Sequence, residues 1–227
     1  LGLAAAGLAW TLARMRHPDA SRALLLFWTP AALLIILAMN SRLLVGVRYV
    51  LPAIPLMIAG SAPFAARLLA IRSGPWVLGA CTAASLAASA VVFPNGLSFF
   101  NLPAGGPEQG WHLLADSNLD WGQNLPQLSE KFDELGIEKI RGAYFGQDYP
   151  YRYFSRAEYE PLVTPFCEAC PKDRVFRPEP GWYAISVNML LGYHWPPEYR
   201  DYFRYFRERR PDAQAGYSIY LYRIPDR

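Results

Sequence analysis

The chain has 227 residues, of which 52% are hydrophobic and 18% are charged. Residues 1–94 hold seven arginines and one acid, whereas residues 95–227 hold fifteen basic and eighteen acidic residues. The apolar, basic first part argues against a wholly soluble chain, and the acidic second part argues against a nucleic-acid partner.

Four apolar runs in the first part predict membrane helices. Residues 23–41, 49–66 and 75–93 are uncharged stretches of nineteen, eighteen and nineteen residues, and thirteen more uncharged residues open the chain. A membrane-spanning helix needs about 20 apolar residues. Buried core helices are the alternative, but these runs leave no amphipathic partner to cover them. We expect a membrane α-helical bundle of about four spans over residues 1–94, and because the chain starts at Leu1 we expect the first span to be truncated.

The arginines predict an orientation for this bundle. Three arginines lie in the segment 14–22 and two in the segment 67–72. The positive-inside rule places both segments in the cytoplasm, and everything after Phe93 then faces outward. Two further arginines, at Arg42 and Arg48, lie in a loop that this rule places outside.

Residues 95–227 read as a small α/β domain. Strands are expected at residues 110–117, 138–146, 181–190 and 215–224, and helices at 125–136 and 196–209, from their apolar spacing and their turn residues. Residues 147–180 look irregular. The alternation of strands and helices predicts a mostly parallel or mixed sheet.

The octapeptide DSNLDWGQ at residues 116–123 nearly matches a calcium loop. Asp116, Asn118 and Asp120 stand at positions one, three and five, but the glycine is one place late at Gly122, and Gln127 stands where a glutamate is needed. A divalent metal is therefore disfavoured, and no cofactor is expected.

Two interpretations of this loop remain open. Asp116, Asn118 and Asp120 can accept hydrogen bonds from backbone N–H groups in a structural junction between strand and helix. Trp121 would then pack beneath this junction, and Gln123 and Asn124 would open the helix. Alternatively the same side chains form a ligand site, because loops at the carboxyl ends of strands in open α/β sheets bind ligands.

Other candidate motifs favour structural roles. Cys167 and Cys170 have the spacing of a redox pair, but an outward-facing compartment and flanking prolines favour a disulfide bond. Aromatic residues alternate with arginines at residues 149–154 and 199–210, which favours an amphipathic surface over ligand stacking.

Five segments resemble one enzyme family. They are RYVLPAIPLM at 48–57, PNGLSFFNLPAGGPEQG at 94–110, LADSNLDWGQNLPQL at 114–128, PGWYAISVNMLLG at 180–192 and AGYSIYLYRI at 215–224. Together they resemble the C-terminal part of bacterial membrane glycosyltransferases of the GT-C type, similar to protein O-mannosyltransferases. The resemblance implies a multi-pass inner-membrane protein with a periplasmic C-terminal domain.

The resemblance also implies a reaction and its partners. Such an enzyme transfers a sugar from a polyprenyl-phosphate carrier to a periplasmic glycan, lipid or protein acceptor. The family's catalytic aspartate lies in an early periplasmic loop upstream of these residues, so no catalytic residue is assigned. Arg48 and Tyr49, at the outward mouth of a predicted span, are candidates to bind the carrier phosphate. The alternatives are a membrane-anchored periplasmic binding or scaffold domain, and a transporter or flippase component.

Overall fold

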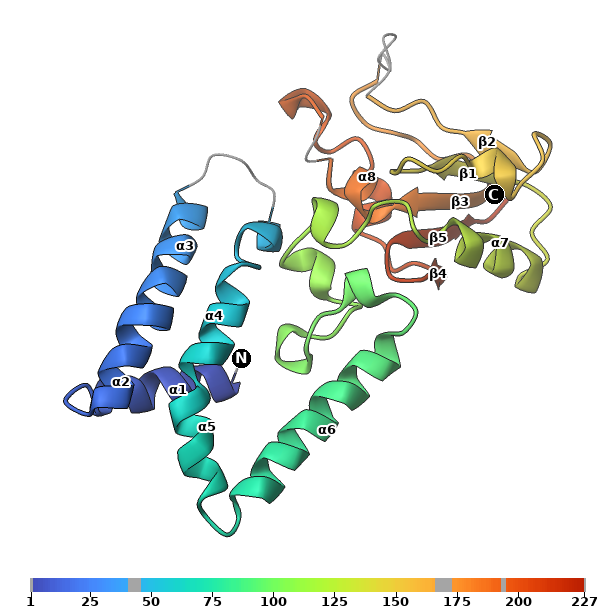
Figure 1. The fold of residues 1–227 in the computed structure, drawn as a ribbon. Coiled ribbons are helices and arrows are strands. Elements are labelled where there is room, and N and C mark those ends of the chain that lie inside the picture. The colour runs from blue at the N-terminus through green and yellow to red at the C-terminus, as the bar shows by residue number, and fades with distance from the viewer. Residues whose placement is uncertain (1, 41–45, 166–172, 193–194, 227) are drawn as a thin grey trace. The chain divides into compact units, whose positions relative to one another are not determined.

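The computed structural model describes residues 2–40, 46–165, 173–192 and 195–226. The chain divides into two compact units, Leu1–Val91 and Val92–Arg227. This boundary lies within three residues of the domain boundary expected from composition. The first unit is helical and the second contains a sheet (Figure 1).

The helical unit is built from six α-helices among its described residues. They are α1 (Gly2–Ala13), α2 (Pro18–Ala23), α3 (Thr29–Met39), α4 (Ala53–Gly60), α5 (Ala62–Leu69) and α6 (Gly74–Val92). A π-helical turn, Leu24–Trp28, joins α2 to α3, and a 3-10 helix, Gly46–Tyr49, precedes α4. Pro30 has no N–H to give to the helix, and the Thr29 hydroxyl donates a hydrogen bond of 2.9 Å to the Leu24 carbonyl within the π-helical turn.

Two helices, rather than four, are long and apolar enough to cross a membrane. They are Pro18–Met39 with 22 residues and Gly74–Val92 with 19 residues, while Gly2–Ala13 and Ala53–Leu69 are shorter. The expectation of a four-span bundle is therefore wrong for the described residues. The run at 49–66 fails because Pro52 delays the helix start to Ala53, and Pro63 lacks the N–H that would continue α4 into α5.

Small residues let these helices pack closely. The indole Nε1 of buried Trp28 donates to the Gly60 carbonyl at 3.1 Å. A Cβ on Gly60 would lie 2.8 Å from that nitrogen, and a Cβ on Gly7 would lie 2.7 Å from Ser61 Oγ. Glycine at these contacts therefore allows α1, α4 and the π-helical turn to approach one another, as small residues do between membrane helices.

The second unit contains a five-stranded mixed sheet. Its strands are β1 (Ile140–Ala143), β2 (Tyr159–Pro161), β3 (Gly181–Ser186), β4 (Ala213–Ala215) and β5 (Ile219–Ile224), in the order β2-β1-β3-β5-β4. β1 runs parallel to β2 and β3, whereas β5 runs antiparallel to β3 and β4. The helices are α7 (Leu125–Glu134), α8 (Val187–Leu191) and α9 (Arg204–Arg207). The prediction of a small α/β domain with a mixed sheet is confirmed.

Both faces of the sheet are covered. Tyr183 and Ile185 of β3 lie in one buried cluster with Phe203 and Phe206, while Ala184 lies in a second cluster with residues of α7. This alternation follows from the period of two along a strand. Figure 1 shows α7 on one side of the sheet and α8 at the end of β3.

Two predicted elements of the second unit are wrong. Residues 110–117 form 3-10 turns at Gly110–His112 and Asp116–Asn118 rather than a strand. A short apolar run does not by itself specify a strand, and both sides of β1 are already occupied by β2 and β3.

Residues 196–209 form a 3-10 turn at Pro197–Tyr199 and the short α9 instead of one helix. The adjacent residues Tyr202 and Phe203 are both buried, and a turn at this point directs both side chains into the same core.

Candidate functional site

Six buried polar side chains of the second unit come from distant parts of the chain. They are Ser98, Asp120, Asn124, Ser186, Asn188 and Ser218. Buried polar groups are costly unless they are hydrogen-bonded, so a cluster of this kind calls for an account of every partner. We call these six residues the polar cluster.

The sheet brings two serines of the cluster to one edge. Ser186 is the last residue of β3, and it pairs with Ile219, the first residue of β5. Ser218 directly precedes β5, and its carbonyl accepts a hydrogen bond of 2.8 Å from Val187 N. Because β3 and β5 are antiparallel, the end of one strand and the start of the other meet where the loop 116–123 lies.

Asn188, in α8, holds the start and the middle of this loop. Its Oδ1 accepts from Asp116 N at 2.8 Å, and its Nδ2 donates to the Asp120 carbonyl at 3.4 Å. Asp116 has a φ of 60° and is the one residue other than glycine with a positive φ among those described. Aspartate tolerates this left-handed conformation better than most residues, and the amide of Asn188 holds the strained start of the loop in place.

Asp120 is the central charge of the cluster and is 0% exposed. Its Oδ1 accepts a hydrogen bond of 2.9 Å from Gly122 N. Burial raises the pKa of Asp120 to about 6, although the bond from Gly122 and the nearby hydroxyls of Ser218 and Ser186 act in the opposite direction. Ser218 Oγ and Asp120 Oδ2 are both buried, and neither has a hydrogen-bond partner among the described residues.

Gly122 brings two backbone segments into contact. Its φ is +83°, and a Cβ there would lie 2.0 Å from Tyr144 Oη and 2.7 Å from Gly146 Cα. Tyr144 donates from this hydroxyl to the Gly122 carbonyl at 2.7 Å. Burial first, and then the charge of Asp120, raise the pKa of Tyr144, so its hydroxyl stays a donor at neutral pH.

Two further contacts complete the cluster. Asn124 is fully buried, and its Nδ2 donates to the Ala215 carbonyl at 3.3 Å. Gly216, with a φ of +56°, leaves the space that this amide occupies, since a Cβ there would lie 1.7 Å from Asn124 Nδ2. Ser98 Oγ donates to the Leu119 carbonyl at 3.2 Å.

The remaining loop residues that the sequence singled out have local partners. Trp121 is 49% exposed and donates from Nε1 to the Ser117 carbonyl at 3.0 Å, so it does not pack beneath the loop as expected. Gln123 accepts from Trp121 N at 2.8 Å and donates to the Leu119 carbonyl at 3.1 Å. Asn118 donates to the Ala115 carbonyl at 2.9 Å.

The other candidates lie elsewhere. Arg48 and Tyr49 are exposed on the 3-10 helix Gly46–Tyr49 of the helical unit. Cys167 and Cys170 lie outside the described residues. Within the described ranges, no three His, Cys, Asp or Glu side chains gather in a way that could hold a metal ion.

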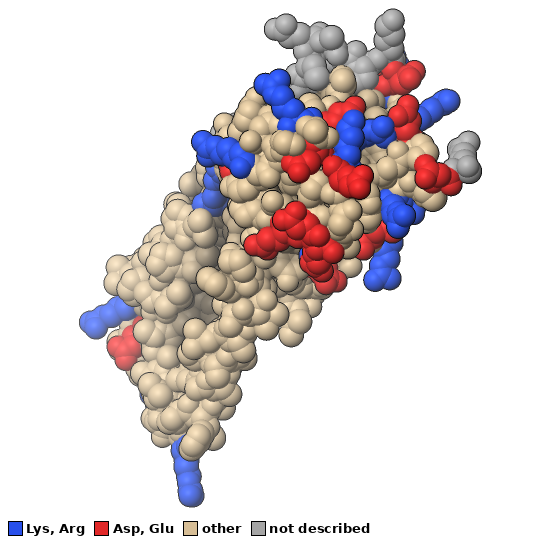
Figure 2. All heavy atoms as spheres, turned by 90° about the vertical axis from the view of Figure 1, so that its right-hand side faces the viewer, with Lys and Arg blue, Asp and Glu red and all other residues tan. Residues whose placement is uncertain are grey.

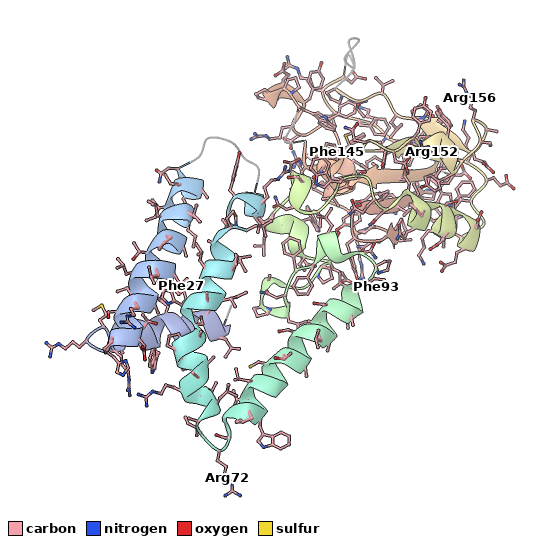
Figure 3. All side chains as sticks on the ribbon, in the orientation of Figure 1. Phe27, Arg72, Phe93, Phe145, Arg152 and Arg156 are labelled. Atoms are coloured by element: carbon pink, nitrogen blue, oxygen red, sulfur yellow. The ribbon has the colours of Figure 1, made fainter. Side chains whose placement is uncertain are left out.

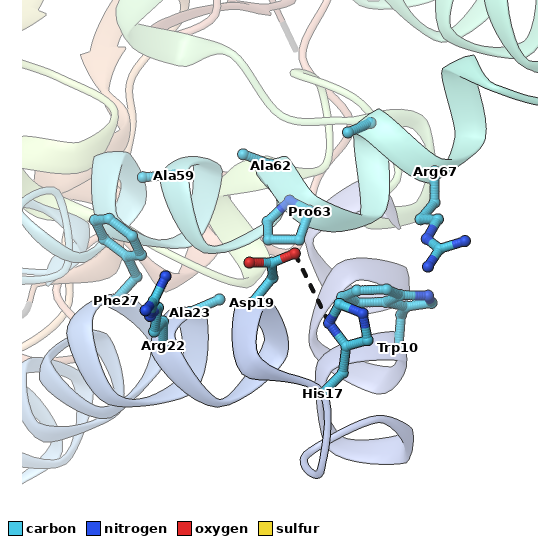
Figure 4. Close-up of a pocket in the computed structure, with 11 residues that line it drawn as sticks. Trp10, His17, Asp19, Arg22, Ala23, Phe27, Ala59, Ala62, Pro63 and Arg67 are labelled. Carbon is cyan, nitrogen blue, oxygen red and sulfur yellow. Dashed lines mark ion pairs between the residues drawn. The ribbon is translucent and has the colours of Figure 1, made fainter.

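The helical unit has a cavity that the sequence did not indicate. It measures about 540 Å³ and is lined by Trp10, His17, Asp19, Arg22 and Arg67 together with apolar residues of α2, α4 and α5. His17 Nδ1 lies 3.7 Å from Asp19 Oδ2 (Figure 4). The cavity therefore combines an apolar wall with side chains of both charges.

Removal of the Asn188 amide should loosen the loop without unfolding the unit. We expect Asn188→Ala to lower the free energy of unfolding by about 1 to 2 kcal/mol, because Asp116 N and the Asp120 carbonyl lose their partner. Hydrogen–deuterium exchange should show faster exchange at residues 116–120. Gln123→Ala is the control, since its two bonds are local to the loop, and an equal effect from both variants would contradict this role for Asn188.

The polar cluster has the composition of a site but the burial of a structural core. Asp120 at 0% exposure is not open to a substrate in this structure, whereas the neighbouring Trp121 is 49% exposed. Comparisons with protein-family models, with curated proteins and with solved structures gave no match for this chain.

Proposed function

We propose that this chain is part of a multi-pass bacterial inner-membrane glycosyltransferase of the GT-C type. It transfers a sugar from a polyprenyl-phosphate carrier to a periplasmic acceptor, and its α/β unit lies on the periplasmic side. The helical unit contributes to the membrane bundle, with further spans and the catalytic residue supplied elsewhere in the protein.

The observation that carries this proposal is the meeting of the resembling segments. Ser98, Asp120, Asn188 and Ser218 come from four separate segments of the resemblance, and all belong to the polar cluster. These segments are up to about 120 residues apart in the chain, so their convergence is a property of the fold and was not visible in the motifs. A common structural role for these four segments supports treating them as one pattern rather than as four chance matches.

The helical unit supports a membrane location. Only 17% and 6% of the most apolar 18 residues of the two long helices are buried within the structure, which is the exposure expected of helices that face lipid. Figure 2 shows the charged side chains gathered over the α/β unit and few over the helices. Within the helical unit, Arg72 lies at the turn between α5 and α6 (Figure 3), at the opposite end from the 3-10 helix that carries Arg48 (Figure 1).

Arg48 is the candidate to bind the carrier phosphate. Arg48 is an exposed residue next to Tyr49 before the start of α4, where a lipid phosphate rests if this end faces outward. An arginine–phosphate hydrogen bond contributes about 1.5 to 3 kcal/mol. In the other possible role, Arg48 only anchors the helix at the lipid headgroups.

The test uses the complete protein in membranes supplied with polyprenyl-phosphate-linked sugars. We expect Arg48→Ala to lower kcat/KM for the lipid-linked donor by about 10- to 100-fold, which corresponds to the loss of one charged hydrogen bond. Arg72→Ala is the matched control, because it removes the same charge at the opposite end of the helices. The amount of folded protein in the membrane should be unchanged in both variants.

Two outcomes would contradict the proposal. No transfer from any polyprenyl-phosphate sugar by the complete protein would contradict the glycosyltransferase assignment and favour a binding or scaffold domain. Transfer with equal kcat/KM in Arg48→Ala and Arg72→Ala would keep the enzyme but remove Arg48 from its donor site.

A further inference from the structure

We propose that residues 93–113 rest in the headgroup region of the bilayer and hold the α/β unit against the membrane surface. This proposal depends on the membrane location of α6 that the proposed function includes. The occupant of the exposed apolar surface is lipid, rather than a second protein.

The segment exposes large apolar side chains. Phe93 is 82% exposed and Leu102 is 86% exposed, the two highest values for large hydrophobic residues in the second unit. Leu97, Phe99 and Leu113 are exposed as well. Five such residues therefore fall within 21 positions, whereas the described residues from 114 to 226 expose seven. An apolar surface concentrated in this way marks an interaction site.

The exposure does not come from a loosely held chain. Phe100 and Trp111 of the same segment pack against the buried cluster of the sheet, and Ser98 bonds to the Leu119 carbonyl at 3.2 Å. Asn101 caps the turn Leu102–Ala104 by accepting from Ala104 N at 3.0 Å. Leu102 is thus exposed on a turn that is held in place, because neighbouring residues of the segment pack against the sheet.

The place of the segment in the chain identifies its partner. Phe93 directly follows Val92, the last residue of α6, and α6 is one of the two helices able to span a membrane (Figure 3). Where α6 leaves the hydrocarbon, the next residues must lie at the interface, and aromatic residues are enriched at that depth. A surface that begins at this point meets lipid before any other partner.

The charge of the segment specifies the type of lipid contact. No lysine or arginine occurs between Arg72 and Lys131, and residues 93–113 contain a single acid, Glu108. Attraction to anionic headgroups needs basic residues near the surface. Contact here therefore depends on apolar burial alone, and it should be the same with zwitterionic and anionic lipids.

Spin labels can measure this contact in the full chain reconstituted into phosphatidylcholine vesicles. In a background with Cys81, Cys167 and Cys170 replaced by serine, single labels are placed by Leu102→Cys, Leu113→Cys, Leu86→Cys in α6 and Glu130→Cys in α7. Glu130 is exposed on the same unit and serves as the aqueous control, while Leu86 reports whether α6 is in lipid. Collisions with oxygen report lipid, and collisions with a water-soluble nickel complex report water.

We expect Leu102 and Leu113 to lose most of their collisions with the nickel complex relative to Glu130, and to collide readily with oxygen. Adding phosphatidylglycerol should leave both values unchanged. If Leu86 is in lipid while Leu102 resembles Glu130, the membrane contact of residues 93–113 is wrong but the spanning helix stands. If Leu86 is itself in water, the membrane location fails first. Protection of Leu102 from both reagents would mean that protein covers it, which also overturns the proposal.

Discussion

Gly122→Ala is expected to lower the free energy of unfolding strongly, although it adds only one methyl group to the loop at residues 116–123. Alanine at a φ of +83° costs about 1 to 2 kcal/mol, and its Cβ would overlap Tyr144 Oη at 2.0 Å and Gly146 Cα at 2.7 Å. Overpacking of this kind costs about 1 to 3 kcal/mol, and the neighbour at Gly146 is backbone that cannot rotate away. The total loss is on the order of 2 to 5 kcal/mol, a large part of the stability of a typical domain.

Amide hydrogen exchange of β1 and β3 in the full chain measures this loss of stability in the α/β unit. Gly136→Ala is the matched control, because Gly136 has a φ of +60° with nothing within 4 Å of its Cβ position. That variant carries the backbone strain without the overlap. Adding Tyr144→Phe to Gly122→Ala should restore part of the stability, since it removes the hydroxyl but leaves Gly146 in place. Equal effects at Gly122 and Gly136 would show that the close approach at Tyr144 is absent.

Asp120→Asn is expected to stabilise the folded protein at neutral pH. The pKa of Asp120 is about 6 in the folded protein against 3.8 for an ordinary aspartate, so the folded state holds this proton more tightly than the unfolded state does. The stability that this proton contributes is fully present below pH 3.8 and is lost as the pH rises to about 6. Since one pKa unit corresponds to about 1.4 kcal/mol, the buried carboxylate costs on the order of 3 kcal/mol at pH 7.

Urea unfolding from pH 4 to pH 8 tests the direction in which the free energy of unfolding changes with pH. The stability of the parent protein should fall over that range by an amount that Asp120→Asn abolishes, because asparagine keeps the acceptor for Gly122 N and carries no charge. Asp148 supplies a control of opposite sign: the bond from Tyr149 N lowers its pKa, so Asp148→Asn should lose stability at neutral pH. A pH profile of Asp120→Asn that parallels the parent would refute an ionised, buried Asp120.

The elements predicted correctly from the sequence are those in which the spacing of apolar residues alone determines the structure. Leu125, Leu128 and Phe132 lie on one face of α7 and are buried as that spacing indicates, whereas Leu135, expected on the same face, follows the end of the helix at Glu134 and is 39% exposed. β1, β3 and β5 were expected as strands, although β3 ends at Ser186 and β5 begins only at Ile219, after a turn that follows β4. The segment 110–117 was mistaken for a strand because strand pairing is decided by the neighbours in the sheet, which a local pattern does not contain.

The candidate site was found only in part for the same reason. The carboxylates and amides of residues 116–123 indicate a candidate site, but Asn188, which holds this loop, and the buried serines Ser186 and Ser218 lie about 60 to 100 positions later in the chain. One signal was available: Ser186 and Asn188 interrupt an otherwise apolar run, and a polar residue in such a run is expected to have a buried partner. Which partner it has depends on the mixed topology of the sheet.

The two outer strands of this sheet disfavour pairing between the sheets of neighbouring molecules. β2 and β4 are each three residues long, and β2 ends in Pro161, which has no N–H to offer to another strand. Lys139 and Glu160 form an ion pair of 2.7 Å beside that edge. Short edges with proline and charge resist the pairing of one sheet with the next. The α/β units of neighbouring molecules can therefore stand close together without fusing their sheets into an aggregate.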